Sequence, residues 1–243
     1  MKKHFPRLHR FLRTLFPKRT KTAPPPKNSS IEENVFVLRK SDGTEINHPH
    51  IEGLEVTFLG KNNTVILHEP LPKFINCEVT LRDNAQFILH GSQYHVRNLV
   101  IWKMRKGSKV EIGKDFSCEG VQFAMQCEEN LSVFIGESCM FSHDIHIQPS
   151  DSHAIIDLDS KKAQNLGKDI YIGNHVWISP DVYILKGSSI PDDSVIGAMS
   201  IVSKKLPDAH AVYVGSPVHK VRSNITWDRS SAFDYERRMA RGC

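Results

Sequence analysis

The sequence lacks long apolar runs. Nowhere among its 243 residues is there a stretch of the roughly 18 consecutive apolar residues that a membrane-crossing helix needs. Its first 30 residues also contain no uninterrupted apolar segment of the kind found in a secretion signal. These two absences argue against a membrane-spanning or secreted protein, and we expect a cytoplasmic one.

Cysteine is scarce and irregularly spaced. The five cysteines include no C-x-x-C pair, and they are Cys77, Cys118, Cys127, Cys139 and Cys243. An odd number without paired spacing fits neither a disulfide scaffold nor a zinc knuckle. We expect reduced, mostly packed cysteines and no bound metal.

Acidic residues are missing from residues 1–27, which carry nine Lys or Arg side chains. Subtracting these nine from the net charge of +5 leaves −4 for the rest of the chain, which argues against a nucleic-acid-binding core. Apolar residues recur at helical spacing in this arm, at Phe5, Leu8, Leu12, Leu15 and Phe16. Such a basic amphipathic segment suits the inner face of an anionic membrane or a polysaccharide-assembly partner, and a frayed solubilising tail is the alternative. With the Pro-rich stretch 22–30, it forms a predicted arm and linker over residues 1–34.

The strongest pattern is a period of six residues. Between residues 172 and 202, every sixth position is β-branched and aliphatic, namely Ile172, Ile178, Ile184, Ile190, Ile196 and Val202. Four positions after each of the first five lies a small or β-branched residue, namely Val176, Val182, Ser188, Ser194 and Ser200. The same frame passes upstream through Ile135, Phe141 and Ile147. Neither an α-helix nor the two-residue alternation of a strand selects every sixth residue.

A triangular solenoid accounts for this period, because three short strands close one coil of about 18 residues. Farther upstream, the segments NNTVIL, NAQFIL, GSKVEI and NLSVFI begin at Asn62, Asn84, Gly107 and Asn130. We interpret them as one face of successive larger coils. The sequence thus predicts an all-β fold, a parallel β-helix over residues 35–218.

The hexads are interrupted near residues 148–169, where we expect a loop extruded from the solenoid, a common place for functional residues. Residues 219–243 are predicted to form a C-terminal tail. Its apolar residues Phe233, Tyr235 and Met239 suggest a short helix that packs on the solenoid or on a neighbouring subunit.

Five strings occur in order along the repeat region: SDSHAIIDLD, GKDIYIGNHVWIS, DVYILKGSSIP, VIGAMSIVSK and YVGSPVHKV. With the tail NITWDR, they make the chain resemble the hexapeptide-repeat acyltransferases, especially the branch that O-acetylates capsular sialic-acid polysaccharides. The resemblance implies a left-handed β-helix, acetyl-CoA as co-substrate, and a homotrimer with cofactor clefts between subunits. It predicts an O-acetyltransferase that acts on a sugar hydroxyl of a capsular or surface polysaccharide.

Acetyl transfer from a thioester to a sugar hydroxyl requires a base, because the hydroxyl is a weak nucleophile at neutral pH. A histidine suits this task, since its ordinary pKa is about 6.5. The D-x-H context of His153 matches the catalytic histidine of the family, so the resemblance predicts His153 as the general base. Asp151 or Asp157 would orient its imidazole, with a backbone carbonyl as the alternative.

The resemblance also suggests residues for the cofactor and the acceptor. Trp177 would donate its indole N–H to the developing oxyanion or hold the thioester end of acetyl-CoA, and a packed corner aromatic is the alternative. The small residues Ser179, Gly197 and Ala198 would allow close approach of the pantetheine arm. The cations of Lys204 and Lys205 would meet its phosphates, and His143 would line the acceptor pocket.

Three competing interpretations remain open at this point. A zinc enzyme similar to γ-type carbonic anhydrase would need converging imidazoles, for which His143, His146 and His153 are candidates. A non-catalytic binding scaffold would not depend on His153. N-acetylation of an amino-sugar nucleotide is the nearest rival among transferases.

Overall fold

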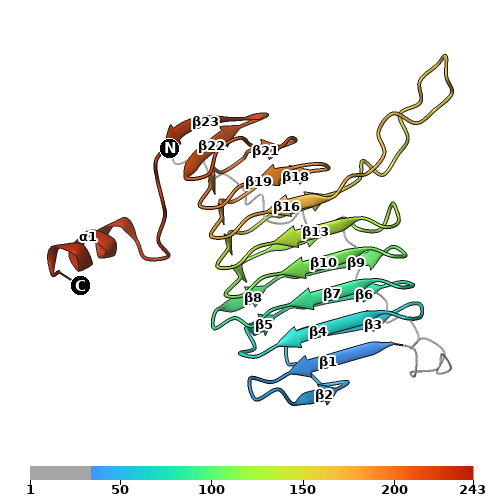
Figure 1. Ribbon diagram of the computed structural model, residues 1–243, viewed down its shortest axis with the longest axis horizontal. Coiled ribbons are helices and arrows are strands. Elements are labelled where there is room, and N and C mark those ends of the chain that lie inside the picture. The colour runs from blue at the N-terminus through green and yellow to red at the C-terminus, as the bar shows by residue number, and fades with distance from the viewer. Residues whose placement is uncertain (1–33, 243) are drawn as a thin grey trace, which may run out of the picture. The chain divides into compact units, whose positions relative to one another are not determined.

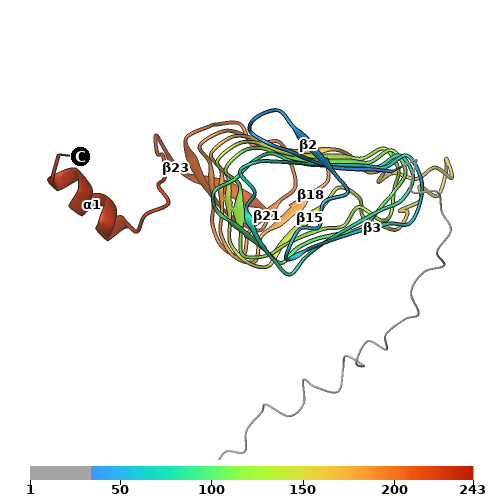
Figure 2. The same cartoon turned by 90° about the horizontal axis from the view of Figure 1, so that it is seen from below.

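The structure is a computed structural model that describes residues 34–242. Three sheets of short strands surround a single core, and the chain visits them in turn as it winds from one coil to the next (Figures 1 and 2). Within residues 34–242, the helix α1 (Ala232–Ala240) has nine residues, and no helix is long and apolar enough to cross a membrane. The predicted parallel β-helix is confirmed.

The strands of the three sheets stack in register along the solenoid. Sheet A contains, in spatial order, β2 (Glu45–Asn47), β1 (Val35–Arg39), β4 (Thr64–His68), β7 (Gln86–Leu89), β10 (Lys109–Ile112), β13 (Ser132–Ile135), β16 (Ile170–Ile172) and β19 (Ser189–Ile190). Sheet B contains β3 (Leu54–Phe58), β6 (Cys77–Leu81), β9 (Leu99–Met104), β12 (Val121–Phe123), β15 (Ile145–Gln148), β18 (Tyr183–Leu185) and β21 (Ile201–Val202). Sheet C contains β5 (Lys73–Ile75), β8 (His95–Arg97), β11 (Ser117–Cys118), β14 (Met140–Phe141), β17 (Trp177–Ile178), β20 (Val195–Ile196), β22 (Ala211–Gly215) and β23 (Val218–Ser223). Neighbouring strands are parallel except the terminal pairs β1–β2 and β22–β23.

The six-residue period fills the core as expected. Its large residues are at most 4% exposed, and they stack coil on coil through the register pairs Ile172–Ile190, Ile178–Ile196 and Ile184–Val202. The small residues at the corners are fully buried too. Their serines satisfy buried backbone carbonyls: the Ser188 hydroxyl donates to the Leu185 carbonyl, and the Ser194 hydroxyl donates to the Pro191 carbonyl.

The upstream segments also lie where the sequence predicts. They form β4, β7, β10 and β13, four consecutive neighbours in sheet A. Asn62, Asn84 and Asn130 precede three of these strands in the left-handed region, with φ of 53–58°, where asparagine is among the best-tolerated residues. Gly107 has φ of 70°, and a Cβ atom there would lie 2.1 Å from the Asn130 Oδ1 atom, so only glycine fits.

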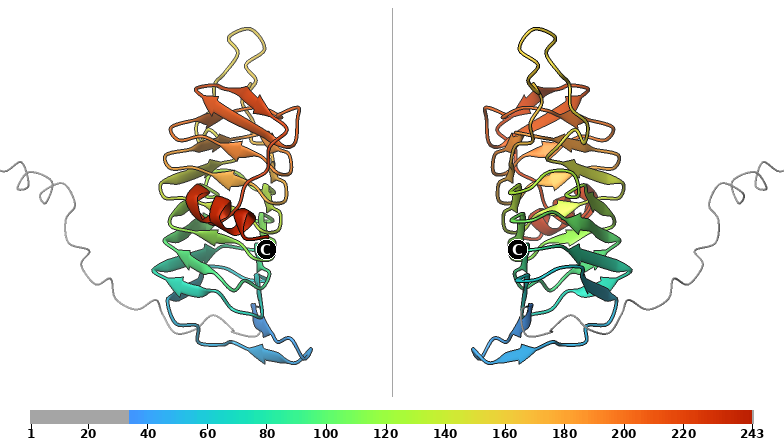
Figure 3. Two further views of the ribbon diagram at one scale, coloured as in Figure 1. Left: turned by 90° about the vertical axis from the view of Figure 1, so that its left-hand side faces the viewer. Right: turned by 90° about the vertical axis from the view of Figure 1, so that its right-hand side faces the viewer.

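The C-terminal segment departs from the prediction in one respect. The helix α1 is present, capped by the Ser231 hydroxyl, which accepts a hydrogen bond from the Asp234 N–H. However, none of its residues is buried, and it projects away from the solenoid (Figures 1 and 2), whose stacked coils Figure 3 shows from two sides. Its apolar residues Phe233, Tyr235 and Met239 are all exposed, although Tyr235 lines a cavity together with Met140 and Trp177 of the solenoid.

Cys77, Cys118 and Cys139 are buried and unpaired, and Cys127 is partly exposed. Burial raises the pKa of the Cys139 thiol to about 12, so that thiol stays protonated at neutral pH. Cys243 and nearly all of the predicted arm and linker lie outside the described residues.

Candidate active site

His153 lies on the loop that joins β15 to β16, at the corner between sheets B and A. This loop, residues 149–169, extends away from the solenoid (Figure 1). The backbone N–H of His153 donates to the Asp151 carbonyl, and the Asn165 amide donates both to the His153 carbonyl and to the Asp151 carboxylate, each at 2.8 Å. Across residues 34–242, the exposed His153 imidazole has no hydrogen-bond or ion-pair partner, so it is available to a substrate.

Two side chains from neighbouring coils hold the base of this loop. The Glu128 carboxylate accepts hydrogen bonds from the Ser150 hydroxyl near one end of the loop and from the Gly167 N–H, at 2.8 Å, near the other. The Lys186 ammonium pairs with the Asp151 carboxylate. The backbone beside His153 is therefore fixed although the rest of the loop is exposed.

Asp151 is close to His153 in the chain, but its carboxylate does not contact the imidazole. It binds Lys186 and Asn165 instead, and these two partners hold the pKa of the Asp151 carboxyl below its ordinary value. Asp157 is likewise occupied within the loop, where its carboxylate accepts hydrogen bonds from Ser160. Among the described residues, no carboxylate orients the His153 ring.

A cavity of about 390 Å³ opens beside His153 over the outer face of sheet B. Most of its polar lining is uncharged, because amide side chains project outward from β12, β15 and the loop after β12. Its lining includes Trp102, Gln122, Gln126, His146, Gln148 and His153. The cavity is thus suited to a ligand rich in hydroxyl groups that lies within reach of the His153 imidazole.

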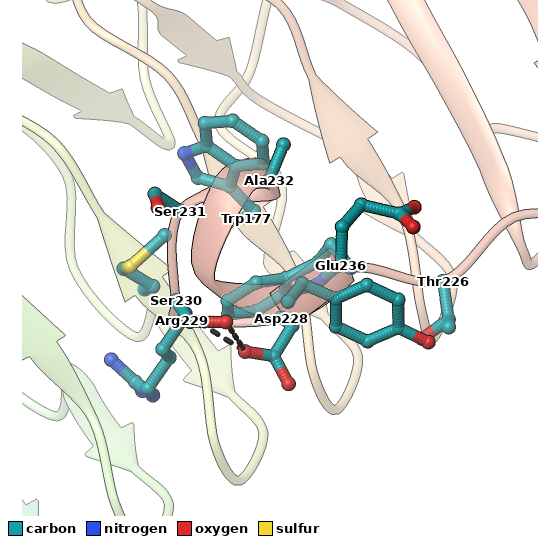
Figure 4. A pocket seen from close by; sticks show the side chains of 11 residues that line it. Trp177, Thr226, Asp228, Arg229, Ser230, Ser231, Ala232 and Glu236 are labelled. Carbon is teal, nitrogen blue, oxygen red and sulfur yellow. Dashed lines mark hydrogen bonds between the residues drawn. The ribbon is translucent and has the colours of Figure 1, made fainter. Parts of the chain in front are cut away.

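Trp177 lies on a different face, on β17 of sheet C. Its indole Nε1 atom is buried and has no hydrogen-bond partner within the described part of the chain. The Trp177 ring is half-buried at a cavity of about 630 Å³ (Figure 4). Its centroid lies 6.2 Å from that of the Trp227 ring, which lines the same cavity. The two cavities have no lining residue in common, so one chain does not bring Trp177 and His153 to the same cavity.

The C-terminal tail builds most of the Trp177 cavity, and this role was not anticipated from the sequence. Trp227 stacks on His175 at 4.3 Å and donates its indole N–H to the His175 carbonyl. The Arg229 guanidinium lies 3.9 Å from the Tyr94 ring centroid and donates to the Ser117 hydroxyl. It also donates to three backbone carbonyls, those of Asp115, Ser138 and Cys139. The one available signal was the tryptophan within NITWDR.

The remaining predicted residues divide between two corners. The corner between sheets C and B carries Ser179, Gly197 and Ala198. Ser179 and Gly197 lie on consecutive coils, which are joined there by a hydrogen bond from the Ser179 N–H to the Ile196 carbonyl. At Gly197, a Cβ atom would lie 2.6 Å from the Val214 side chain. Lys204 and Lys205 are exposed after β21, at the same corner as the His153 loop.

His143 lies at the corner between sheets C and B, away from the His153 loop. Its Nδ1 atom is 2.9 Å from the Asp144 carboxylate, and it lines a third cavity of about 420 Å³ together with Tyr94 and Arg229. From Asn34 to Gly242, no group of three or more His, Cys, Asp and Glu side chains is arranged to hold a metal ion. His143, His146 and His153 therefore do not converge as the zinc interpretation requires.

Two polysialic acid O-acetyltransferases are similar to this chain in sequence. The polysialic acid O-acetyltransferase of Escherichia coli O1:K1 / APEC is 36% identical over 125 residues, which cover 51% of this chain and 40% of that protein. The polysialic acid O-acetyltransferase of Neisseria meningitidis is 29% identical over 175 residues, 72% of this chain and 80% of that protein. The chain therefore matches less than half of the first relative's length but most of the second's.

Among solved structures, the polySia-specific acetyltransferase NeuO superposes with a TM-score of 0.56 at 29% identity, covering 85% of this chain and 94% of that one. No protein-family profile matches the sequence.

Proposed function

This chain belongs to the hexapeptide-repeat acetyltransferase family, and we propose that it transfers an acetyl group from acetyl-CoA to a hydroxyl group of a sialic-acid polysaccharide. Both relatives described above act on polysialic acid, and the similarity to the second covers 72% of this chain. The observation that carries the proposal is the exposed imidazole of His153, which has no partner in the described part of the chain and lies at the edge of an amide-lined cavity.

We assign His153 the role of general base. Its imidazole accepts the proton of the acceptor hydroxyl while the oxygen forms a bond to the thioester carbonyl carbon. The resulting tetrahedral intermediate collapses, the C–S bond breaks, and the protonated imidazole returns its proton to the sulfur of coenzyme A. The products are an acetate ester and a free thiol, and the base is regenerated.

The oxyanion of that intermediate needs a hydrogen-bond donor already in place. Trp177 supports this role, because its ring lines a cavity and its Nε1–H has no hydrogen-bond partner within residues 34–242. Because Trp177 and His153 line separate cavities in one chain, we propose that they meet across an interface between two copies. A cyclic homotrimer would form three such sites, each completed by a neighbouring subunit.

In this arrangement the cofactor lies between two corners of neighbouring subunits. The small residues Ser179, Gly197 and Ala198 would admit the pantetheine arm of acetyl-CoA beside Trp177. The exposed ammonium groups of Lys204 and Lys205, on the His153 corner of the other subunit, would neutralise its phosphates.

The proposal is tested by following thiol release from acetyl-CoA against sialic-acid oligomers and neutral oligosaccharides. We expect release with the sialic-acid oligomers, and its loss in a His153→Ala variant. The product should lose its acetyl group in mild base, because an ester hydrolyses there while an amide survives. A base-stable product would favour N-acetylation of an amino sugar. Thiol release that is unchanged by His153→Ala would show that neither reaction takes place at the His153 site.

The N-terminal arm supports a further part of the proposal, association with an anionic membrane surface. Its nine cations within residues 1–27 should bind vesicles containing anionic lipid at low salt and release them as salt is added. Vesicle cosedimentation of the full chain and of a chain lacking residues 1–27 checks this. Equal cosedimentation of the two would remove the arm from the proposal.

A further inference from the structure

The His153 cavity contains a polar atom that the proposed reaction does not use. The side-chain Oε1 atom of Gln126 is buried and has no hydrogen-bond partner within residues 34–242. A buried acceptor without a donor is costly to the fold, and such atoms are few in native proteins. Gln126 lies on the loop that follows β12 and lines the same cavity as His153. Gln126 is therefore a residue of the cavity wall whose side-chain oxygen has no donor within residues 34–242.

An irregularity in sheet B brings an aromatic ring to the edge of this cavity. Between β6 and β9 the register shifts by one residue, because Val79 pairs with Ile101 whereas Leu81 pairs with Met104. The extra residue leaves two consecutive side chains, Trp102 and Lys103, exposed where regular alternation would bury one. Lys103 has φ of 43°, and bulges of this kind redirect side chains near functional sites. Trp102 is 50% exposed and lines the cavity.

We propose that Gln126 and Trp102 form the subsite that recognises the acceptor sugar. The Gln126 carbonyl oxygen accepts a hydrogen bond from a hydroxyl group of the sugar ring. The Trp102 ring packs against the apolar C–H face of the same ring, a contact typical of tryptophan at sites that are apolar on one side and wet on the other. This subsite rests on the proposed function, because it presents a sugar hydroxyl to His153.

The size and polarity of the cavity agree with this assignment. A volume of about 390 Å³ is within the range for small-molecule sites and can accommodate one sugar unit of a longer chain. The outward amides of Gln122 and Gln148 provide both donors and acceptors for the remaining hydroxyl groups. The carboxylate of Asp151, the anionic group at the cavity, is paired with Lys186, so it does not repel an acidic sugar strongly.

The decisive variant is Gln126→Met, which keeps the length of the side chain and removes its polar atoms. Because Gln126 Oε1 has no hydrogen-bond partner among residues 34–242, the melting temperature should not fall. The KM for a sialic-acid oligomer should rise about tenfold, while the KM for acetyl-CoA stays the same. Gln86→Met is the matched control, since Gln86 is an exposed amide on β7 of sheet A, and its acceptor KM should not change.

Trp102 is tested by direct binding of the same oligomer, measured by calorimetry with no acetyl-CoA present. Trp102→Ala should weaken binding about tenfold and Trp102→Phe should retain most of it, because a smaller ring still packs on the sugar. Unchanged acceptor KM in Gln126→Met, or unchanged affinity in Trp102→Ala, would overturn the subsite while transfer by the unmodified protein still supports the function. If the unmodified protein neither binds nor acetylates any oligomer, the function and the subsite both fail.

Discussion

Mixed oligomers of the His153→Ala and Trp177→Ala variants should regain activity if the catalytic centre lies between subunits. His153 and Trp177 line cavities with no residue in common, so one chain alone does not complete the proposed site. His153→Ala removes the proposed base and should reduce turnover by a factor of about 10² to 10⁴. Trp177→Ala removes a proposed oxyanion donor and should cost about 10² to 10³. Each variant alone should therefore retain about 1% of normal activity or less.

The magnitude of the rescue follows from symmetry. When the two variants are co-expressed equally and mix at random in a trimer, each site takes His153 from one copy and Trp177 from the next. Both residues are intact at about a quarter of these sites, so about 25% of normal activity should return. If each site lay within one chain, every site would lack one residue and none would recover.

The assay follows thiol release from acetyl-CoA with mixed oligomers purified through a different affinity tag on each variant. Light scattering must show that the single variants and the mixture have the oligomeric state of the unmodified protein. Activity of the mixture that stays at the level of the single variants would refute the intersubunit site. It would also require Trp177 to be removed from the catalytic proposal.

Three residues outside the reaction centre should each affect stability in a different way. Ile184 is fully buried in the solenoid core, so Ile184→Ala should lower the free energy of unfolding by about 2–5 kcal/mol in a denaturant titration. A loss of stability below that range would show that the coils collapse around the space left by the removed side chain. Lys186→Met removes the cation that lowers the pKa of Asp151, so the variant should melt below the unmodified protein at neutral pH. The stabilisation from the Lys186–Asp151 pair is present above the ordinary pKa of Asp, about 4, and is lost as pH falls through the lowered pKa. The melting temperatures of the variant and the unmodified protein should therefore converge in acid. A difference that widens in acid would contradict the assignment. Arg229→Lys keeps the charge but loses the planar guanidinium that binds one hydroxyl and three carbonyls. The free energy of unfolding should therefore fall by about 1.5–3 kcal/mol, and the near-ultraviolet circular dichroism of Trp227 should weaken. An unchanged spectrum would show that other contacts hold the tail.

Much of the solenoid was predictable from spacing alone. Every sixth residue from Ile172 to Val202 is buried because each short strand contributes one large side chain to the core, and this requirement is written directly in the sequence. The turn residues Asn62, Asn84 and Asn130 mark the coils for a similar local reason, since their backbone adopts a left-handed conformation. The loop that carries His153 was visible as an interruption of the same period.

Contacts between residues far apart in the chain were not predictable in this way. Asp151 was one of the groups considered for orienting the His153 imidazole, with Asp157 and a backbone carbonyl as the others. Its carboxylate instead binds Lys186, which lies 35 residues away on the next coil. Likewise, the Arg229 side chain reaches the Ser117 hydroxyl across 112 residues, and no local pattern records that distance.

The sequence by itself determined which side chains face inward, where each coil turns, and which imidazole stands on an extruded loop. Tertiary structure decided that Gln126 and Trp102 share a cavity with His153 and that Trp177 lies on another face. The physical reason is that the repeat fixes whether each side chain of a strand faces the core or the solvent. A site depends instead on which loops from different coils come into contact. That meeting is set by coil lengths, by a single-residue bulge in β9, and by a tail that returns to earlier coils.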